Sequence, residues 1–149
     1  MIIEMKLMSQ IKSELGFSIG EETEINVVSS LPWSPENLVK ATKTYVIYKD
    51  GYPVTDGHLL FVPLKTNYLF VMDCFSEAYK TGILGVEKGD WDSFNVGMNF
   101  GQEAGQTIDW PHIHMIPRRK GDMKDPRGGV RHVIPEKGNY RINNEDNDN

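Results

Sequence analysis

Short β-prone segments stand on both sides of one helical segment, and this order limits the folds open to the chain. The turn sequence Asp50-Gly51-Tyr52-Pro53 separates two of them, with glycine available for unusual backbone angles and proline for a fixed one. Strands, one helix and further strands predict an α+β domain with a mainly antiparallel sheet. The β-prone segments are residues 24–29, 42–49, 58–63, 91–99 and 107–117.

The helical segment is expected over residues 67–83. Its apolar side chains are spaced by four, three and four residues, so we expect that face to lie against the sheet. Two glycines follow, and glycine is common where helices end. The apolar residues are Tyr68, Met72, Phe75 and Tyr79, and the glycines are Gly82 and Gly85.

Both ends of the chain differ from its middle. Residues 1–20 are expected to form an N-terminal helical extension, because an apolar residue recurs at every fourth position. Residues 143–149 contain no apolar residue and are expected to be disordered. The main domain is therefore expected over residues 21–142. The recurring apolar residues are Ile3, Leu7, Ile11 and Leu15.

Cysteine content and hydropathy favour a cytoplasmic protein. The single cysteine, Cys74, allows no disulfide within the chain and suits a reducing compartment. No run approaches the roughly 18 consecutive apolar residues of a membrane span, so no membrane partner is expected.

The distribution of charge favours phosphate as a ligand. The formal net charge of −5 disfavours a stable nucleic-acid partner. Residues 118–137 nevertheless hold seven basic and three acidic residues, a net +4, which leaves −9 for the rest of the chain. Arginine and lysine pair with phosphate oxygens, although a solvated basic loop has the same composition.

Two histidines alternate with apolar residues in the segment Trp110-Pro111-His112-Ile113-His114-Met115. On a strand, His112 and His114 share one face about 6.6 Å apart, while the apolar residues face the opposite layer. Three interpretations are open: hydrogen-bonded structural histidines, a metal site with His58 as a third ligand, and nucleophilic catalysis by an imidazole.

Neutral hydrogen-bond donors precede the histidines. Asn99, Gln106 and Thr107 lie in a glycine-rich stretch just before them. Sites of phosphoryl transfer need such donors, because their catalysis is mostly positioning and charge stabilisation. The other aromatic and imidazole residues are interpreted more simply, Trp33 as a core residue and His132 as a surface residue of the basic segment.

Together these motifs resemble the histidine triad superfamily of nucleotide hydrolases and transferases. Residues 105–118 are similar to its signature, in which three histidines alternate with apolar residues after a Gly-Gln-Ser/Thr sequence. The Gly57-His58 strand, Asp50 eight residues before His58, and Asn99 match further family positions, so the resemblance covers roughly residues 45–135. Trp110 occupies the position of the first triad histidine.

The resemblance implies a catalytic set of His112, His114 and Gln106. His112 would attack the α-phosphorus and form a covalent nucleotidyl-histidine, which water or another acceptor then resolves. His114 would contact the phosphate and assist the leaving group, and Gln106 would donate to a phosphate oxygen or to the displaced group. In the family, the carbonyl two residues before the nucleophile orients it, and Trp110 supplies that carbonyl.

The resemblance also implies a set of substrate-binding residues. Asp50 would hold the ribose hydroxyls and His58 would stand beside the catalytic histidines. Trp110 is interpreted either as an apolar filler or as a stacking surface over the substrate. Contacts to the phosphates are expected from Asn99, Thr107 and Arg118.

The fold implied by the resemblance is the α+β histidine triad fold, with about five mainly antiparallel strands, one central helix and the N-terminal extension. A homodimer and a small nucleotide substrate are expected. Hydrolysis would release a nucleoside monophosphate from a dinucleoside polyphosphate or a nucleoside phosphoramidate, and the basic segment favours several phosphates. No cofactor or protein-bound metal is expected, although a divalent cation could accompany the substrate phosphates.

Three alternatives remain open at the level of sequence. One is a catalytically weakened protein that binds nucleotides without turnover. Another is a nucleotidyltransferase that passes the nucleotide to an acceptor other than water. The third is a metal site formed by His58, His112 and His114. The zinc site found near the N-terminus of some relatives is not expected, because its cysteine pair is missing.

Overall fold

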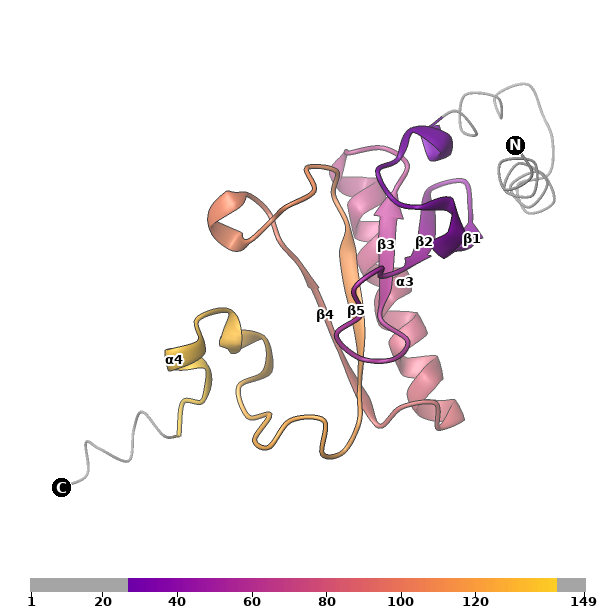
Figure 1. Ribbon diagram of the computed structural model, residues 1–149. Helices are drawn as coiled ribbons and strands as arrows, with labels where there is room; N and C mark the ends of the chain where they lie inside the picture. Colours follow the sequence, from indigo (N-terminus) through magenta and orange to yellow (C-terminus); the bar gives the residue numbers. More distant parts are fainter. Residues whose placement is uncertain (1–26, 142–149) are drawn as a thin grey trace.

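The computed structural model describes residues 27–141 as a five-stranded antiparallel sheet with one long helix on one face (Figure 1). The strands lie in the order β1-β2-β3-β5-β4. This confirms the α+β prediction of about five strands and one central helix. The elements are η1 (Pro35–Asn37), β1 (Leu38–Ala41), β2 (Tyr45–Lys49), β3 (Leu59–Pro63), α3 (Tyr68–Lys88), β4 (Ser93–Met98), η2 (Gln102–Ala104), β5 (Ile113–Arg118), η3 (Gly129–Val133) and α4 (Pro135–Gly138).

Most strand predictions are confirmed, and the exceptions lie at the ends of the domain. The strand predicted over residues 24–29 is wrong for its described part, because residues 27–30 are helical and Val28 is buried there. Strand β1 was not expected and pairs with β2 at one edge of the sheet. Packing against the rest of the domain determines the structure of both segments, as is common where the local preference for strand is weak.

The sheet is buried on both of its faces near β2 and β3. Alternation along β2 sends Tyr45 and Ile47 to the α3 face, where they pack with Phe61 and Cys74. Val46 and Tyr48 point the other way. The cluster on that second face is made of Val28, Leu31, Ala41, Val46, Tyr48, Leu60, Val62 and Leu64. The helix therefore covers only one of two cores.

Helix α3 begins and ends at recognisable signals but packs with an unexpected face. The Asn67 side chain accepts a hydrogen bond from the Phe70 amide at 3.0 Å, and Gly89 closes the helix with a φ of 77°. The predicted apolar face is wrong for three of its four residues: Tyr68, Met72 and Tyr79 are exposed, and only Phe75 packs against the core. The face against the sheet holds Cys74, Ala78, Gly82 and Gly85 instead.

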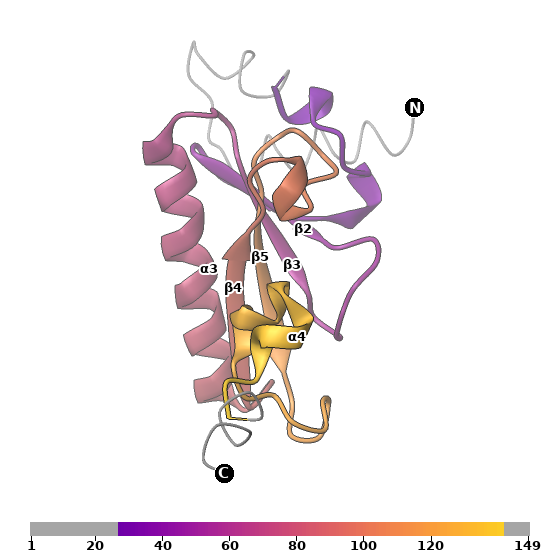
Figure 2. The same ribbon diagram turned by 90° about the vertical axis from the view of Figure 1, so that its left-hand side faces the viewer.

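Gly82 and Gly85, expected at the end of the helix, lie inside it. Aromatic rings pack against both glycines. A Cβ on Gly82 would collide with the Phe94 ring, and one on Gly85 would collide with the Trp91 ring. The Trp91 indole also donates a hydrogen bond to the Gly82 carbonyl at 3.0 Å. Small residues thus allow α3 to lie close to the segment that leads into β4 (Figure 2).

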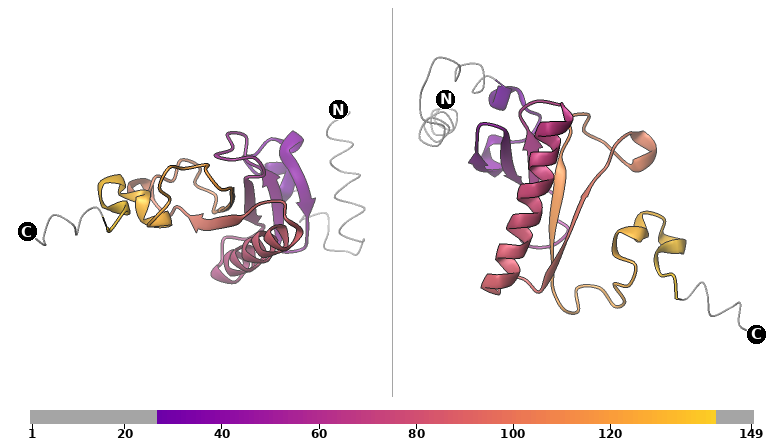
Figure 3. Two further views of the ribbon diagram at one scale, coloured as in Figure 1. Left: turned by 90° about the horizontal axis from the view of Figure 1, so that it is seen from below. Right: turned by 180° about the vertical axis from the view of Figure 1, so that it is seen from behind.

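The C-terminal part of the described chain extends beyond the β4 edge of the sheet. Both η3 and α4 belong to it, and Figure 3 shows them well away from α3. The extension predicted at residues 1–20 and the tail at 143–149 lie outside the described residues. No helix within residues 27–141 has the length and apolar character to cross a membrane.

Candidate active site

The two motif histidines lie side by side at the start of β5. His112 immediately precedes the strand, His114 is its second residue, and their ring centroids are 5.1 Å apart. Ile113 and Met115 are fully buried on the α3 face. The expectation of two imidazoles on one face is therefore confirmed, and the alternation of the motif produces it.

A backbone carbonyl orients His112. Its Nδ1 lies 2.8 Å from the carbonyl oxygen of Trp110, and because a carbonyl only accepts, Nδ1 carries the proton. The other ring nitrogen, Nε2, then has a free lone pair whenever the ring is neutral. The edge of Trp33 packs at 5.2 Å between centroids, and only 8% of His112 is exposed. The ring is thus held in one orientation and one tautomer.

Trp110 supplies that carbonyl while its own side chain packs elsewhere. The indole Nε1 donates a hydrogen bond to the Pro63 carbonyl at 2.8 Å. The ring packs against the core cluster that includes Val62 and Leu64. The structure thus favours the apolar-filler interpretation of Trp110, with the indole directed to the end of β3.

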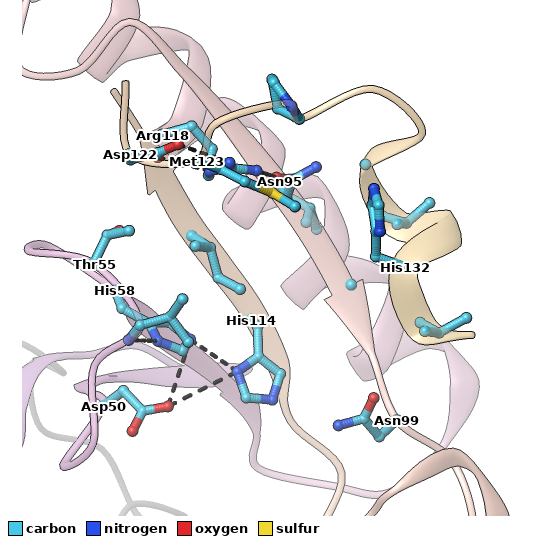
Figure 4. Close-up of a pocket in the computed structure, with 18 of the residues that line it drawn as sticks. Asp50, Thr55, His58, Asn95, Asn99, His114, Arg118, Asp122, Met123 and His132 are labelled. Carbon is cyan, nitrogen blue, oxygen red and sulfur yellow. Dashed lines mark hydrogen bonds and ion pairs between the residues drawn. The ribbon is translucent and has the colours of Figure 1, made fainter. Parts of the chain in front are cut away.

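A chain of hydrogen bonds sets the protonation of His58 and His114. The Val54 amide donates to His58 Nδ1 at 3.2 Å, so the proton of the neutral His58 ring is on Nε2. That Nε2 lies 2.9 Å from His114 Nδ1 and 3.4 Å from Asp50 Oδ2 (Figure 4). His114 Nδ1 therefore accepts, and its Nε2–H remains as a donor.

Burial keeps both of these imidazoles neutral at neutral pH. Desolvation lowers the pKa of His58, and the Asp50 carboxylate opposes this only in part. The pKa of His114 falls to about 4, first because of burial and then because of the neighbouring His112 and His58, again against Asp50. The two imidazole rings of His58 and His114 are therefore neutral and lie beside the carboxylate of Asp50.

These groups also raise the question of a metal ion. The structure gathers Asp50, His58 and His114, each with a ligand atom within 4.8 Å of the others, rather than the predicted set that included His112. A metal on His58 Nε2 would shift the ring proton to Nδ1, directly against the Val54 amide. The hydrogen bonding of His58 therefore does not fit the role of a metal ligand.

A cavity of about 850 Å³ opens beside His114 (Figure 4). Its walls come from the loop before β3, from β4 and β5, and from the segment that contains η3. Of the predicted site residues, it gathers Asp50, His58, Asn99, His114 and Arg118.

Four predicted site residues do not line the cavity: His112 and Trp110, described above, and Gln106 and Thr107 in the loop before β5. Gln106 Oε1 accepts from the Gly101 amide at 2.8 Å, and its Nε2 donates to the carbonyls of Ile108 and Asp109. Its side chain therefore braces the loop. Thr107 is exposed.

Arg118 lines the cavity, but its guanidinium is held by neighbours. Its Nε and Nη2 each lie 2.8 Å from the Asp122 carboxylate, and Nη1 donates to Asn95 Oδ1 at 2.8 Å. The guanidinium lowers the pKa of Asp122 to about 2. The arginine predicted to contact phosphate is thus paired with a carboxylate in this structure.

Other cations of the basic segment also have partners within it. Arg127 pairs with Asp125 at 3.0 Å, and Arg131 donates to the Gly138 carbonyl at 3.2 Å. The Arg131 bond joins η3 to α4. Much of the local positive charge is therefore part of the structure of this segment.

Sequence reasoning missed several polar residues of the cavity wall, among them His132 and Asn95. His132 was interpreted as a surface residue, yet it is half-buried, lines the cavity, and donates from Nε2 to the Arg127 carbonyl at 2.9 Å. Asn95 lines the cavity from β4. The period of two along Asn95, Gly97 and Asn99 was a signal that could have identified it.

Comparison with known proteins places these features in a family. The HIT domain model matches residues 32–121. The chain is 36% identical over 91 residues to bis(5'-adenosyl)-triphosphatase of Saccharomyces cerevisiae, covering 50% of this chain and 44% of the yeast protein. It is 30% identical over 94 residues to a HIT-like protein of Methanocaldococcus jannaschii, covering 59% of this chain and 73% of that one. The chain thus spans less than half of the yeast protein.

Solved structures share the fold. A zinc-bound histidine triad family protein from Mycobacterium smegmatis superimposes with a TM-score of 0.57 at 24% identity, covering 68% of this chain and 77% of that chain. Sheet order, central helix and histidine-bearing strand agree with the match of the family model over most of the described residues. The chain belongs to the HIT domain family.

Proposed function

We propose that the protein is a nucleotide hydrolase that cleaves at the α-phosphate of a nucleoside phosphate derivative and releases a nucleoside monophosphate. The observation that carries this proposal is the 2.8 Å hydrogen bond from His112 Nδ1 to the Trp110 carbonyl. It leaves the Nε2 lone pair as a nucleophile in a fixed orientation. It also explains how a chain without the first triad histidine keeps a working nucleophile.

The reaction runs in two displacements. His112 Nε2 attacks the α-phosphorus, the bond to the leaving-group oxygen breaks, and that oxygen departs with the electron pair. The Nε2–H of His114 donates a hydrogen bond to the oxygen on which charge develops. Water then attacks the phosphorus, the P–N bond breaks, the pair returns to His112, and the water proton passes to solvent.

The substrate proposed is a dinucleoside polyphosphate, with nucleoside phosphoramidates as the other class. The similarity to the yeast bis(5'-adenosyl)-triphosphatase supports the first class. The basic segment supports it less than the sequence suggested, because Arg118 and Arg127 are already paired with carboxylates. We also propose a cytoplasmic homodimer that needs no cofactor, with a divalent cation entering only with the substrate phosphates.

A second function has its own supporting observation. Gln106 was expected to donate to the phosphate, but its side-chain amide donates to the loop carbonyls of Ile108 and Asp109 instead. A site that binds nucleotides without turning them over fits this arrangement. Calorimetric titration with AMP beside an activity assay separates the two functions, since tight binding with no product would favour the second.

The direct test uses two substrates, diadenosine triphosphate and adenosine 5′-phosphoramidate, with AMP release as the readout. We expect His112→Gly to lower kcat by at least about a thousandfold, as removal of a nucleophile does in other enzymes. Lys43→Ala, in an exposed turn far from the cavity, serves as the control. Unchanged AMP release by His112→Gly would refute the nucleophile assignment.

A further inference from the structure

The cavity continues past His114 along the sheet, beyond the residues that the proposed chemistry uses. In the β4–β5 register, Gly97 lies opposite His114 and Asn95 lies opposite Ile116. Two residues along a strand span about 6.8 Å, so Asn95 lies about that far along β4 from Gly97, the residue opposite His114, and on the same face of the sheet. Nothing lies within 4 Å of a Cβ built on Gly97, which leaves the space between them open.

Asn95 presents a hydrogen-bond donor of fixed orientation to the cavity on the side of η3, where its Nδ2 lies 3.6 Å from a Cβ built on Gly129. Its Oδ1 accepts from Arg118 Nη1 at 2.8 Å, and two further 2.8 Å bonds to Asp122 hold the guanidinium in place. The amide therefore cannot flip without placing its –NH2 against the guanidinium. No residue within 27–141 accepts a hydrogen bond from that –NH2, so its protons are available to a ligand.

Exposed apolar side chains from the C-terminal segment complete the wall. Met123, Val130 and Val133 line the cavity while 43%, 62% and 79% exposed. His132 also lines the cavity (Figure 4), and its ring is fixed by its bond to the Arg127 carbonyl. With Arg118 neutralised by Asp122, this end of the cavity combines apolar walls with a neutral donor.

Such a surface suits a flat, uncharged heteroaromatic ring with a hydrogen-bond acceptor on its edge, and it suits a phosphate poorly. We propose that it is a subsite for the nucleobase of the leaving group, reached from His114 through the space over Gly97. The proposal rests on the proposed function, because it makes the substrate a dinucleoside polyphosphate. It names Asn95 and the apolar residues of η3 as determinants of specificity.

The test measures binding in the His112→Gly background, so that it does not depend on turnover. Diadenosine triphosphate and ATP carry the same adenosine and three phosphates, but only the first has a second nucleoside. We expect diadenosine triphosphate to bind at least about tenfold more tightly by calorimetry, the effect of roughly one good contact of 1.4 kcal/mol. Asn95→Leu and Val133→Asp should each remove that advantage while changing ATP affinity by less than about twofold.

Leu69→Asp is the matched control for Val133→Asp, since Leu69 is an exposed apolar residue, 62% exposed, on α3. Val133 is itself mostly exposed, so its variant keeps the fold even if Asn95→Leu does not. Equal affinities for the two ligands, or equal losses in the variants, would overturn the subsite. A hydrolysis assay of the unmodified protein tests the proposed function separately, because AMP release does not enter the binding comparison.

Discussion

At the scale of single residues, the site depends on which nitrogen of each imidazole carries its proton. The Trp110 carbonyl leaves a lone pair on His112 Nε2, whereas Val54 and His58 leave a proton on His114 Nε2. In the proposed mechanism, these two chemically identical side chains therefore serve as a nucleophile and a hydrogen-bond donor. Trp110, at the position expected for the first triad histidine, supplies the backbone carbonyl that orients His112.

The role of Trp110 leads to a prediction about stability. Trp110→Phe removes the hydrogen bond to Pro63 and part of the packing, so we expect a loss of about 1–3 kcal/mol in the free energy of unfolding by urea. The backbone carbonyl remains, so kcat should change by less than about threefold, well under 1.4 kcal/mol. Lost activity at full stability would instead identify the indole as a substrate contact.

The hydrogen-bond chain through His58 predicts a spectroscopic result. Long-range proton–nitrogen NMR spectra of the free protein should show His114 with its proton on Nε2. His58→Gln keeps an N–H donor near His114 Nδ1 and should preserve that tautomer, whereas His58→Leu removes the donor and should not. A His114 tautomer that is the same in all three proteins would contradict the assignment.

At the scale of elements, the helix shows where sequence periodicity fails. The spacing of Tyr68, Met72 and Tyr79 located α3 correctly but chose the wrong face. Small residues make that choice: Gly82 and Gly85 bring the helix close to two aromatic rings, and hydropathy gives glycine little weight. The histidine strand was predictable because strict alternation in β5 leaves only one way to bury Ile113 and Met115.

Close packing at Gly85 predicts a large effect from a small change. Gly85→Ala places a Cβ within contact of the Trp91 ring, so we expect destabilisation of about 1–3 kcal/mol despite the higher helix propensity of alanine. Ser76→Ala, at an exposed position of the same helix, is the control and should be neutral or slightly stabilising. Urea unfolding of both variants is the measurement, and a stabilised Gly85→Ala protein would refute the packing argument.

At the scale of the whole molecule, the sheet separates a packed core from the candidate site. The α3 face holds a closed core, and β5 carries its histidine toward a cavity completed by the C-terminal segment. The family resemblance implied that His58 stands beside the catalytic histidines and that Asp50 belongs to the same site, and the structure brings Asp50, His58 and His114 together. The contribution of residues 118–133 was not predictable in detail, because ion pairs such as Arg118–Asp122 form only after the segment folds back.

Buried neutral histidines make global stability depend on pH. The pKa of His114 is lowered to about 4 in the folded protein, from an ordinary value of 6.5, so the unfolded chain binds more protons between those values. Stability is therefore complete above pH 6.5 and lost as pH falls toward 4. We expect urea unfolding at pH 5 to show about 1–2 kcal/mol less stability than at pH 7, and His114→Gln to reduce that difference. An equal pH dependence in the variant would contradict this.

The double displacement at His112 is tested most directly by the stereochemistry at phosphorus. Hydrolysis of a dinucleoside polyphosphate with a chiral thiophosphate at the α-position, in water labelled with heavy oxygen, reports the number of in-line displacements. Two displacements through a nucleotidyl-histidine invert twice, so retention of configuration is the predicted result. Inversion would show that water attacks the phosphorus directly and would contradict the role assigned to His112.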